Sequence, residues 1–135
     1  MPRIVTVTRD EIDLTDLVRT LTTSDCGAVL TFLGVVRDHA GGRRVASIEY
    51  TAYEEMAESE LRAVVDRVAD EHRVENVAVV HRIGHLEVGE TSLGVVVASP
   101  HRREAFGCGL AIIDELKKTV PVWKKEIGPD GSHWV

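Results

Sequence analysis

The sequence predicts one domain that mixes helices and strands, of the α+β or mixed α/β class. Two long stretches repeat apolar residues at helical spacing, and the rest of the chain holds short runs that alternate or are rich in β-branched residues. Some of these runs are separated by turns and others by a helix, so hairpins and helical crossovers occur together. The 135 residues contain no repeat and no linker, which predicts a single domain over 1–135.

The first half of the chain predicts three strands, one helix and one loop. The run from Gly27 to Arg37 is long and rich in strand-forming residues, which indicates a buried strand. Asp13 stands where a residue that caps a helix N-terminus is favoured, and adjacent glycines mark the loop. The strand after the loop is expected to return beside the buried one. The expected elements are a strand over 3–8, a helix over 14–22, a strand over 27–37, a loop over 38–44 and a strand over 45–53.

The second half of the chain opens with the clearest helix, in which apolar residues at helical spacing face a charged side. A second long helix follows, because Ser99 is a good N-cap and Pro100 suits the first helical position. Pro121 ends that helix because it lacks the N–H that would continue it. The expected elements are a helix over 54–73, a strand over 74–84, a turn over 85–90, a strand over 91–99, a helix over 100–119 and a strand over 122–127.

Composition excludes several classes of function. The chain carries 16 basic and 22 acidic residues, a formal charge of −6, whereas a general nucleic-acid binder usually has a basic excess. No apolar run approaches the roughly 20 residues of a membrane span. Cys26 and Cys108 have no Cys or His neighbours at zinc-binding spacing, and they do not indicate a disulfide framework. We therefore expect a cytoplasmic protein without a metal site or cofactor, in which any anion site is local.

The stretch KKTVPVWKKE concentrates four lysines in this acidic chain. At about 100° per residue, an apolar arc centred on Phe106 includes Leu110, and Lys117 falls inside this arc at about 20°. Lys118 and Cys108 fall on the polar side. Lys117 is therefore expected to be partly buried. Either its stem covers the core while the amine reaches solvent, or the amine lies in a confined pocket.

The first turn of the same helix carries His101 and Arg102, and Arg102 projects toward the inner side. Free backbone N–H groups and the positive end of the helix dipole favour an anion there. Exposed arginines at a surface or interface would give the same pattern. Arg37, at a strand end before a flexible loop, can fork onto a phosphate or carboxylate, although most such arginines are simply solvated.

Alternation in the last strand places Lys124 and Glu126 on one face and Lys125 on the other face with Trp123. Glu126 can then orient the Lys124 ammonium or hold a substrate. The alternative is an ion pair of little energetic weight on a half-exposed strand. The pattern predicts an anion pocket in which Lys117, from a helix, and Lys124, from a strand, converge.

Four blocks of the sequence together resemble the large, catalytic subunit of molybdopterin synthase. They are FLGVVRDHAGGRRVASIEYTAYEEMAESEL, HRIGHLEVGE, ASPHRREAFGCGLAIIDELKKTVPVWKKE and DGSHWV, and they cover nearly all of the chain from Gly27 to Trp134. The resemblance implies an α/β hammerhead fold with an additional antiparallel β portion. It also implies a homodimer that binds a small ubiquitin-like sulfur-carrier subunit, which gives a heterotetramer.

The activity implied by the resemblance is the conversion of cyclic pyranopterin monophosphate to molybdopterin. Sulfur arrives as a thiocarboxylate on the C-terminal glycine of the carrier subunit. The resemblance implies that Lys117 and Lys124 are catalytic, and it implies neither a metal nor another cofactor. The residues that it places at the substrate are Val35, Val36, Arg37, His101, Arg102, Lys117, Lys124, Lys125 and Glu126.

Two other functions are compatible with the residues alone. One is a lyase that forms a Schiff base between Lys117 and a phosphorylated carbonyl compound. The other is a non-catalytic module whose basic cleft grips the Gly-Gly tail of a carrier protein. A strict requirement for a thiocarboxylated partner excludes the first, and turnover of a pterin excludes the second.

Overall fold

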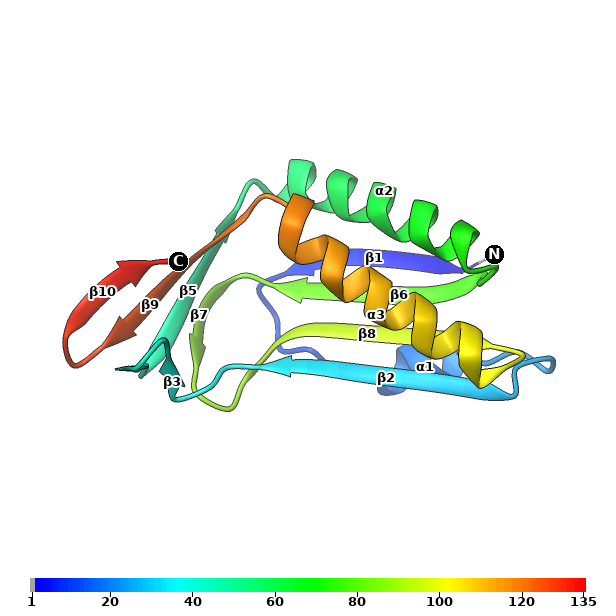
Figure 1. Ribbon diagram of the computed structural model, residues 1–135, viewed down its shortest axis with the longest axis horizontal. Coiled ribbons are helices and arrows are strands. Elements are labelled where there is room, and N and C mark those ends of the chain that lie inside the picture. The colour runs from blue at the N-terminus through cyan, green and yellow to red at the C-terminus, as the bar shows by residue number, and fades with distance from the viewer. Residues whose placement is uncertain (1) are drawn as a thin grey trace.

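The computed structural model describes residues 2–135, and no helix within that range is long and apolar enough to cross a membrane. Strands and helices mix along the chain (Figure 1). The helices are α1 (Thr15–Leu21), α2 (Glu54–Glu71) and α3 (Arg102–Thr119). The strands are β1 (Arg3–Thr8), β2 (Ala28–Val35), β3 (His39–Ala40), β4 (Arg43–Arg44), β5 (Ser47–Ala52), β6 (Asn76–Arg82), β7 (Gly84–Glu87), β8 (Thr91–Ser99), β9 (Val122–Gly128) and β10 (Gly131–Trp134).

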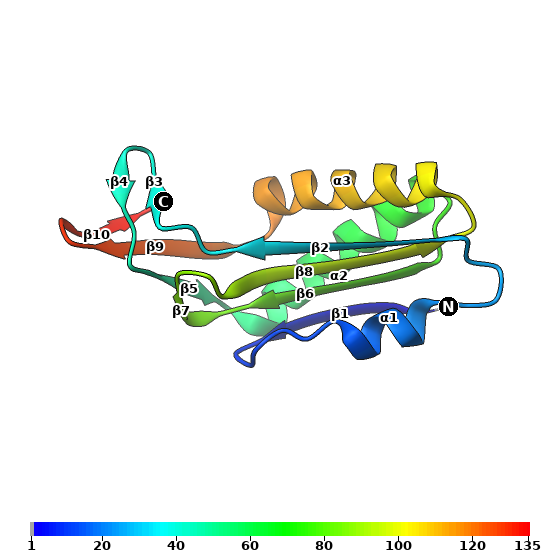
Figure 2. The ribbon, with the colours of Figure 1, turned by 90° about the horizontal axis from the view of Figure 1, so that it is seen from below.

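Four strands form the main sheet in the order β1, β6, β8, β2. β1 runs parallel to β6, and the other neighbours are antiparallel. α2 and α3 cover one face of this sheet and α1 covers the other (Figure 2). The valine-rich central strands β6 and β8 are almost entirely buried, because both of their faces pack against helices.

A second sheet, in the order β10, β9, β5, β7, lies beyond the C-terminal end of α3 (Figure 1). All of its neighbours are antiparallel. A small apolar cluster that includes Val36, Ile48 and Leu86 packs against it. The β3–β4 hairpin turns at Gly41 and Gly42, whose φ angles of 55° and 78° are accessible to glycine at little cost.

The mixed α/β class is confirmed, but two strands have different neighbours from those expected. The run predicted to be a buried strand forms β2, the edge of the main sheet, where every second residue faces solvent. The strand predicted to return beside it forms β5 in the second sheet. The turn expected over 85–90 contains part of β7. Sequence pattern identifies a strand, whereas its neighbours depend on tertiary packing.

α3 presents a different face to the core from the one predicted. Phe106 and Leu110 are each 63% exposed, so the inward position predicted for these two is wrong, whereas Ile112 and Leu116 are buried. Cys108, which the helical angles place on the polar side, is buried as well. A Cβ on Gly109 would lie 2.6 Å from Cδ2 of Leu30 on β2, so the small residues of the helix allow close approach to the sheet. The buried residues of α3 are Ala105, Cys108, Gly109, Ile112 and Leu116.

α3 also begins later than predicted. Ser99 is the last residue of β8, and its hydroxyl donates to the His101 carbonyl at 2.6 Å instead of capping the helix. His101 occupies the N-cap position, and its side chain makes no capping hydrogen bond. The N–H groups of the first turn are therefore left to solvent or to a bound anion.

Candidate functional site

Lys124 and Glu126 lie on one face of β9, as alternation predicts. Glu126 is only 4% exposed, and the side chain of Lys124 is 36% exposed. The Lys124 ammonium lies 3.9 Å from Oε2 of Glu126. The carboxylate thus restrains an amine that still reaches solvent, which suits a lysine that meets an anionic substrate.

Arg43, on β4, is a second cation at Glu126. Its Nη2 donates to Oε1 of Glu126 at 3.3 Å, so each carboxylate oxygen faces a different positive charge. Buried carboxylates require such pairing because their transfer out of water is costly. The sequence does not predict this contact, because the two residues are 83 positions apart and no local pattern links them.

Tyr50, on β5, is the cross-strand neighbour of Lys124. Burial raises the pKa of its phenol, and the negative charge of Glu126 adds to the increase. The Tyr50 ring meets the ring of His81 edge to face, with centroids 5.4 Å apart. Burial lowers the pKa of His81, so Tyr50, the cross-strand neighbour of Lys124, packs on a ring whose neutral form is favoured.

Lys125 lies on the opposite face of β9, as predicted. Its ammonium is 5.6 Å from the ring centroid of Trp134 on β10, within cation–π range. Trp123, on the same face, packs edge to face on Tyr53 at 6.0 Å and is exposed. The Lys125 side chain therefore does not point toward the amine of Lys124.

The end of β2 carries the next group of expected residues. Val36 is buried, its N–H donates to the Glu90 carbonyl at 3.0 Å, and its carbonyl accepts from Gly89 at 2.9 Å. Val35 and Arg37 on either side of it are exposed. Val36 therefore anchors this strand end, and Arg37 is the member of the group that is free to reach an anion.

The lysines at the C-terminal end of α3 are both exposed. This is as expected for Lys118, but the predicted partial burial of Lys117 is wrong for the single chain. Lys117 lies on the side of α3 that also carries Phe106 and Leu110, and all three side chains are exposed. Lys117 would become enclosed only if another molecule covered that face.

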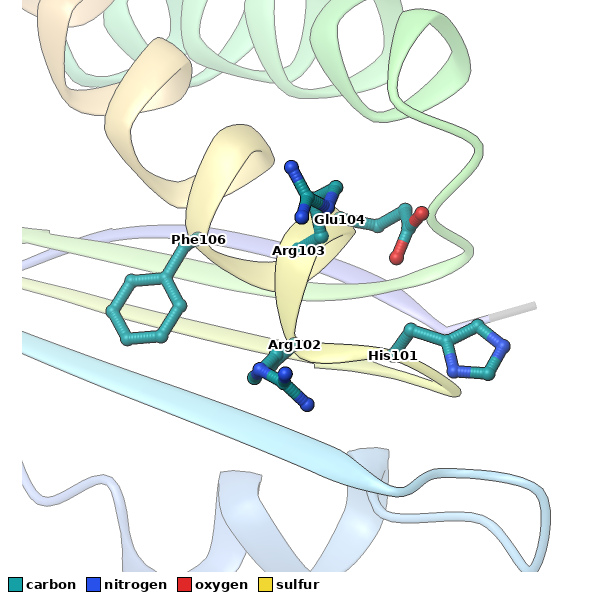
Figure 3. Close-up of a pocket in the computed structure, with 5 residues that line it drawn as sticks. All are labelled: His101, Arg102, Arg103, Glu104 and Phe106. Carbon is teal, nitrogen blue, oxygen red and sulfur yellow. The ribbon is translucent and has the colours of Figure 1, made fainter.

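The N-terminal end of α3 forms a shallow pocket of about 480 Å³. Its walls include two arginines, and Figure 3 shows Arg102 and Phe106 on the side of the helix that looks toward β2. The helix dipole and the uncapped N–H groups add positive potential there. The pocket residues are His101, Arg102, Arg103, Glu104 and Phe106.

The expected substrate residues form two groups in one chain. Lys117 follows Arg102 by about four helical turns, so the two groups lie about 22 Å apart along α3. A small substrate cannot touch both. The expected substrate residues therefore cannot all meet one small substrate within a single copy, because α3 carries Arg102 at one end and Lys117 at the other (Figure 1).

The cysteine in the core, Cys108, is not a reactive thiolate. Burial raises the pKa of Cys108 to about 11, so its thiol stays protonated at neutral pH. Cys26 is a free, half-buried thiol far from β9 in the sequence. Within residues 2–135, no three His, Cys, Asp or Glu side chains are placed to hold a metal ion.

Comparison with known proteins connects this geometry to a family. A family model described as MoaE protein matches residues 7–119. The molybdopterin synthase catalytic subunit of Pyrococcus abyssi is 40% identical over 126 residues, which span 93% of this chain and 85% of that protein.

Solved structures share the fold. The X-ray structure of molybdopterin synthase from Staphylococcus aureus superposes with a TM-score of 0.91 at 33% identity, over 97% of this chain and 96% of that one. A chain from the complex of subunits 1 and 2 of molybdopterin-converting factor from Helicobacter pylori has a TM-score of 0.76, over 96% of this chain and 88% of that one. At 18% identity, the second likeness concerns the fold alone.

Proposed function

Since the chain belongs to the MoaE family, whose relative in Pyrococcus abyssi is named molybdopterin synthase catalytic subunit, we propose that it converts cyclic pyranopterin monophosphate to molybdopterin. The sulfur donor is the thiocarboxylated C-terminus of a small ubiquitin-like carrier subunit. The observation that carries this assignment is the Lys124 amine restrained by a buried Glu126 beside the end of α3. The free cysteines are compatible with a cytoplasmic location.

The separation of the two groups along α3 supports a homodimer with shared sites. The midpoint between Arg102 and Lys117 lies next to Leu110, on the outer face of the helix. A two-fold axis that crosses α3 there would bring the partner's Arg102 beside Lys117 and complete two equivalent sites. Phe106 and Leu110 are 63% exposed apolar side chains that this packing would bury.

The phosphate is held by the cationic groups. His101 and Arg102 supply side chains at a helix N-terminus, where backbone N–H groups also favour an anion. Arg37 reaches the substrate from the end of β2, where Val35 and Val36 form the adjacent wall. These contacts position the reacting carbons of the pterin side chain, which lowers the entropic part of the barrier.

The sulfur transfer takes place at the lysines. The carrier tail lies along Lys117, and its thiocarboxylate sulfur attacks a substrate carbon. The new C–S bond forms as a C–O bond of that carbon breaks, and the oxygen leaves with the phosphate or as water. Water then hydrolyses the acyl link, so the carrier leaves with a carboxylate and a second carrier supplies the second sulfur. Lys117 and Lys124 transfer protons and stabilise developing negative charge. Glu126 orients Lys124, and Lys125 contributes through its backbone because its side chain points away.

An external sulfur donor agrees with the state of the thiols. The protonated, buried Cys108 cannot act as a nucleophile at neutral pH. A carrier subunit that brings its own sulfur does not require Cys108 to react.

The reaction is tested by mixing the chain with thiocarboxylated carrier and cyclic pyranopterin monophosphate and measuring dithiolene formation.

We expect Lys117→Ala to lower the rate by about 100-fold, because it removes a proton-transfer group and a contact with the carrier tail. Lys118→Ala, one position along on the same exposed turn, is the matched control and should stay within about twofold. A normal rate for Lys117→Ala would remove Lys117 from the mechanism. Borohydride trapping of a carbonyl substrate on Lys117 would point to a Schiff-base lyase instead.

A further inference from the structure

Glu126 is the one acidic residue in the range 2–135 whose side chain is buried. Its two oxygens contact two cations, Arg43 at 3.3 Å and Lys124 at 3.9 Å. Two further residues lie opposite this pair on the neighbouring strands. Tyr50 on β5 stands opposite Lys124, and His133 on β10 stands opposite Glu126. Arg43 and Lys124 are the basic side chains that contact Glu126.

The backbone holds Arg43 in place. A Cβ on Gly128 would lie 2.1 Å from the Arg44 carbonyl oxygen, so β4 presses directly on the end of β9. Just after β4, the N–H of Ala46 donates to the carbonyl of Ile127, the residue before Gly128, at 2.7 Å. The hairpin is thus fixed against the strand that carries Glu126, and the guanidinium contact does not depend on a mobile loop.

The charges of the cluster have a simple consequence. Lys124 and Glu126 alone form a neutral pair, which would attract an anion weakly. With Arg43 the three side chains carry a net charge of one positive unit. Arg43 also shares the carboxylate, so the Lys124 ammonium has a longer and weaker contact with Glu126 than the guanidinium has.

We propose that Arg43 is a positioning residue for the anion site. It neutralises Glu126, and thereby leaves the Lys124 ammonium available to the phosphate-bearing substrate. This inference rests on the proposed function for the identity of the anion, but the charge balance itself concerns this chain alone. Arg43 acts through Glu126 and does not itself touch the substrate.

The ion pair is tested by a double-mutant cycle that needs no turnover. Urea unfolding is measured for the wild type, Arg43→Gln, Glu126→Gln and the double variant. We expect the two substitutions to couple, with the unfolding equilibrium constants departing from a simple product by about threefold or more. Strictly multiplicative effects would overturn the pairing. Arg44→Gln, which removes the same charge from the same hairpin, is the control and should show no coupling to Glu126→Gln.

The charge effect is tested by binding of inorganic phosphate, followed through the amide NMR shifts of Lys124 and Lys125. Arg43→Gln should weaken phosphate binding by about fivefold, Arg43→Lys should restore most of it, and Arg44→Gln should change it by less than about twofold. Equal losses for Arg43→Gln and Arg44→Gln, or no loss for either, would overturn the proposal. If the wild type makes no molybdopterin, the proposed reaction fails while both of these measurements still decide the role of Arg43.

Discussion

Lys124 and Lys125 are adjacent in the chain, yet the pleat of β9 gives them opposite surroundings. Lys124 shares its face with the buried Glu126, and Lys125 lies over the ring of Trp134. Period-2 alternation predicts this split from sequence alone. The contact from Arg43 could not be predicted in this way, because it depends on how a distant hairpin packs against the strand.

A second residue-scale prediction concerns His85, on β7. Its Nε2 contacts Glu87 at 2.9 Å and its Nδ1 contacts Glu49 at 2.8 Å, and these hydrogen bonds raise its pKa above the ordinary value of 6.5. The charged form is therefore stabilised by folding. This contribution to stability is fully present below about pH 6.5 and is lost as the pH rises through the raised pKa.

His85→Gln should consequently lower the free energy of unfolding more at about pH 5.5 than at about pH 8.5. Urea denaturation at both pH values measures the difference between variant and wild type. His39→Gln is a comparison variant, since His39 is also exposed but contacts one carboxylate, Asp38. A penalty for His85→Gln that is the same at both pH values would contradict the assigned charge contacts.

At the scale of elements, α3 combines predictable length with an unpredicted orientation. Apolar periodicity and Pro121 located the helix and its end, and the end at Thr119 is as expected. The core-facing side could not be read from hydrophobicity, because the helix buries Gly109 against Leu30 and exposes Phe106. Close approach of the helix to the sheet favours small residues at the contact, so Ala105, Cys108 and Gly109 are buried together with Ile112 and Leu116, while Phe106 and Leu110 stay outside.

The junction between β4 and β9 gives an element-scale prediction. Gly128→Ala should destabilise the protein by about 2 kcal/mol or more, because a Cβ would meet the Arg44 carbonyl at 2.1 Å and backbone would have to move. Chemical denaturation measures the loss. Gly41→Asn is the control: at φ 55° with nothing within 4 Å, asparagine is tolerated, and stability should change little. An unchanged midpoint for Gly128→Ala would mean that β4 does not pack on β9 as described.

At the scale of the whole molecule, exposed apolar residues indicate a surface that remains to be covered. Phe106 and Leu110 lie on the outer face of α3, and Val29, Leu33 and Val35 are exposed on the edge strand β2. An edge strand with exposed apolar residues pairs readily with another chain. The same face carries Arg102 at one end and Lys117 at the other, which connects assembly to the site.

Leu110→Asp should therefore weaken the proposed homodimer, because it places a charge where apolar contact is expected. Sedimentation velocity measures the shift from dimer to monomer. Met56→Asp is the control, since Met56 is also an exposed apolar helical residue but lies on α2. If Leu110→Asp and the wild type sediment alike, the dimer does not use this face.

Subunit complementation tests whether two copies share a site. Lys117→Ala and Arg102→Ala should each be nearly inactive alone. After unfolding and refolding together, about one quarter of wild-type activity should return, since half of the dimers are mixed and each has one intact site. A mixture of Lys118→Ala with wild-type chains, refolded in the same way, serves as a control that should keep wild-type activity throughout. No recovery in the first mixture would place the whole site within one chain.

The sequence by itself determined the class of the fold, all three helices, six of the ten strands in the range 2–135, and the placement of Lys124 and Glu126 on one face. These features depend on local periodicity and on the nearest neighbours along the chain. The blocks that resemble the molybdopterin synthase catalytic subunit also sufficed to identify the family.

Only the tertiary structure decided that β2 is an edge strand, that α3 buries its small residues, and that Arg43 contacts Glu126. It also separated Arg102 from Lys117 by the length of a helix. Each of these depends on contacts between residues far apart in the chain, and such contacts are selected by close packing and charge burial across the whole molecule.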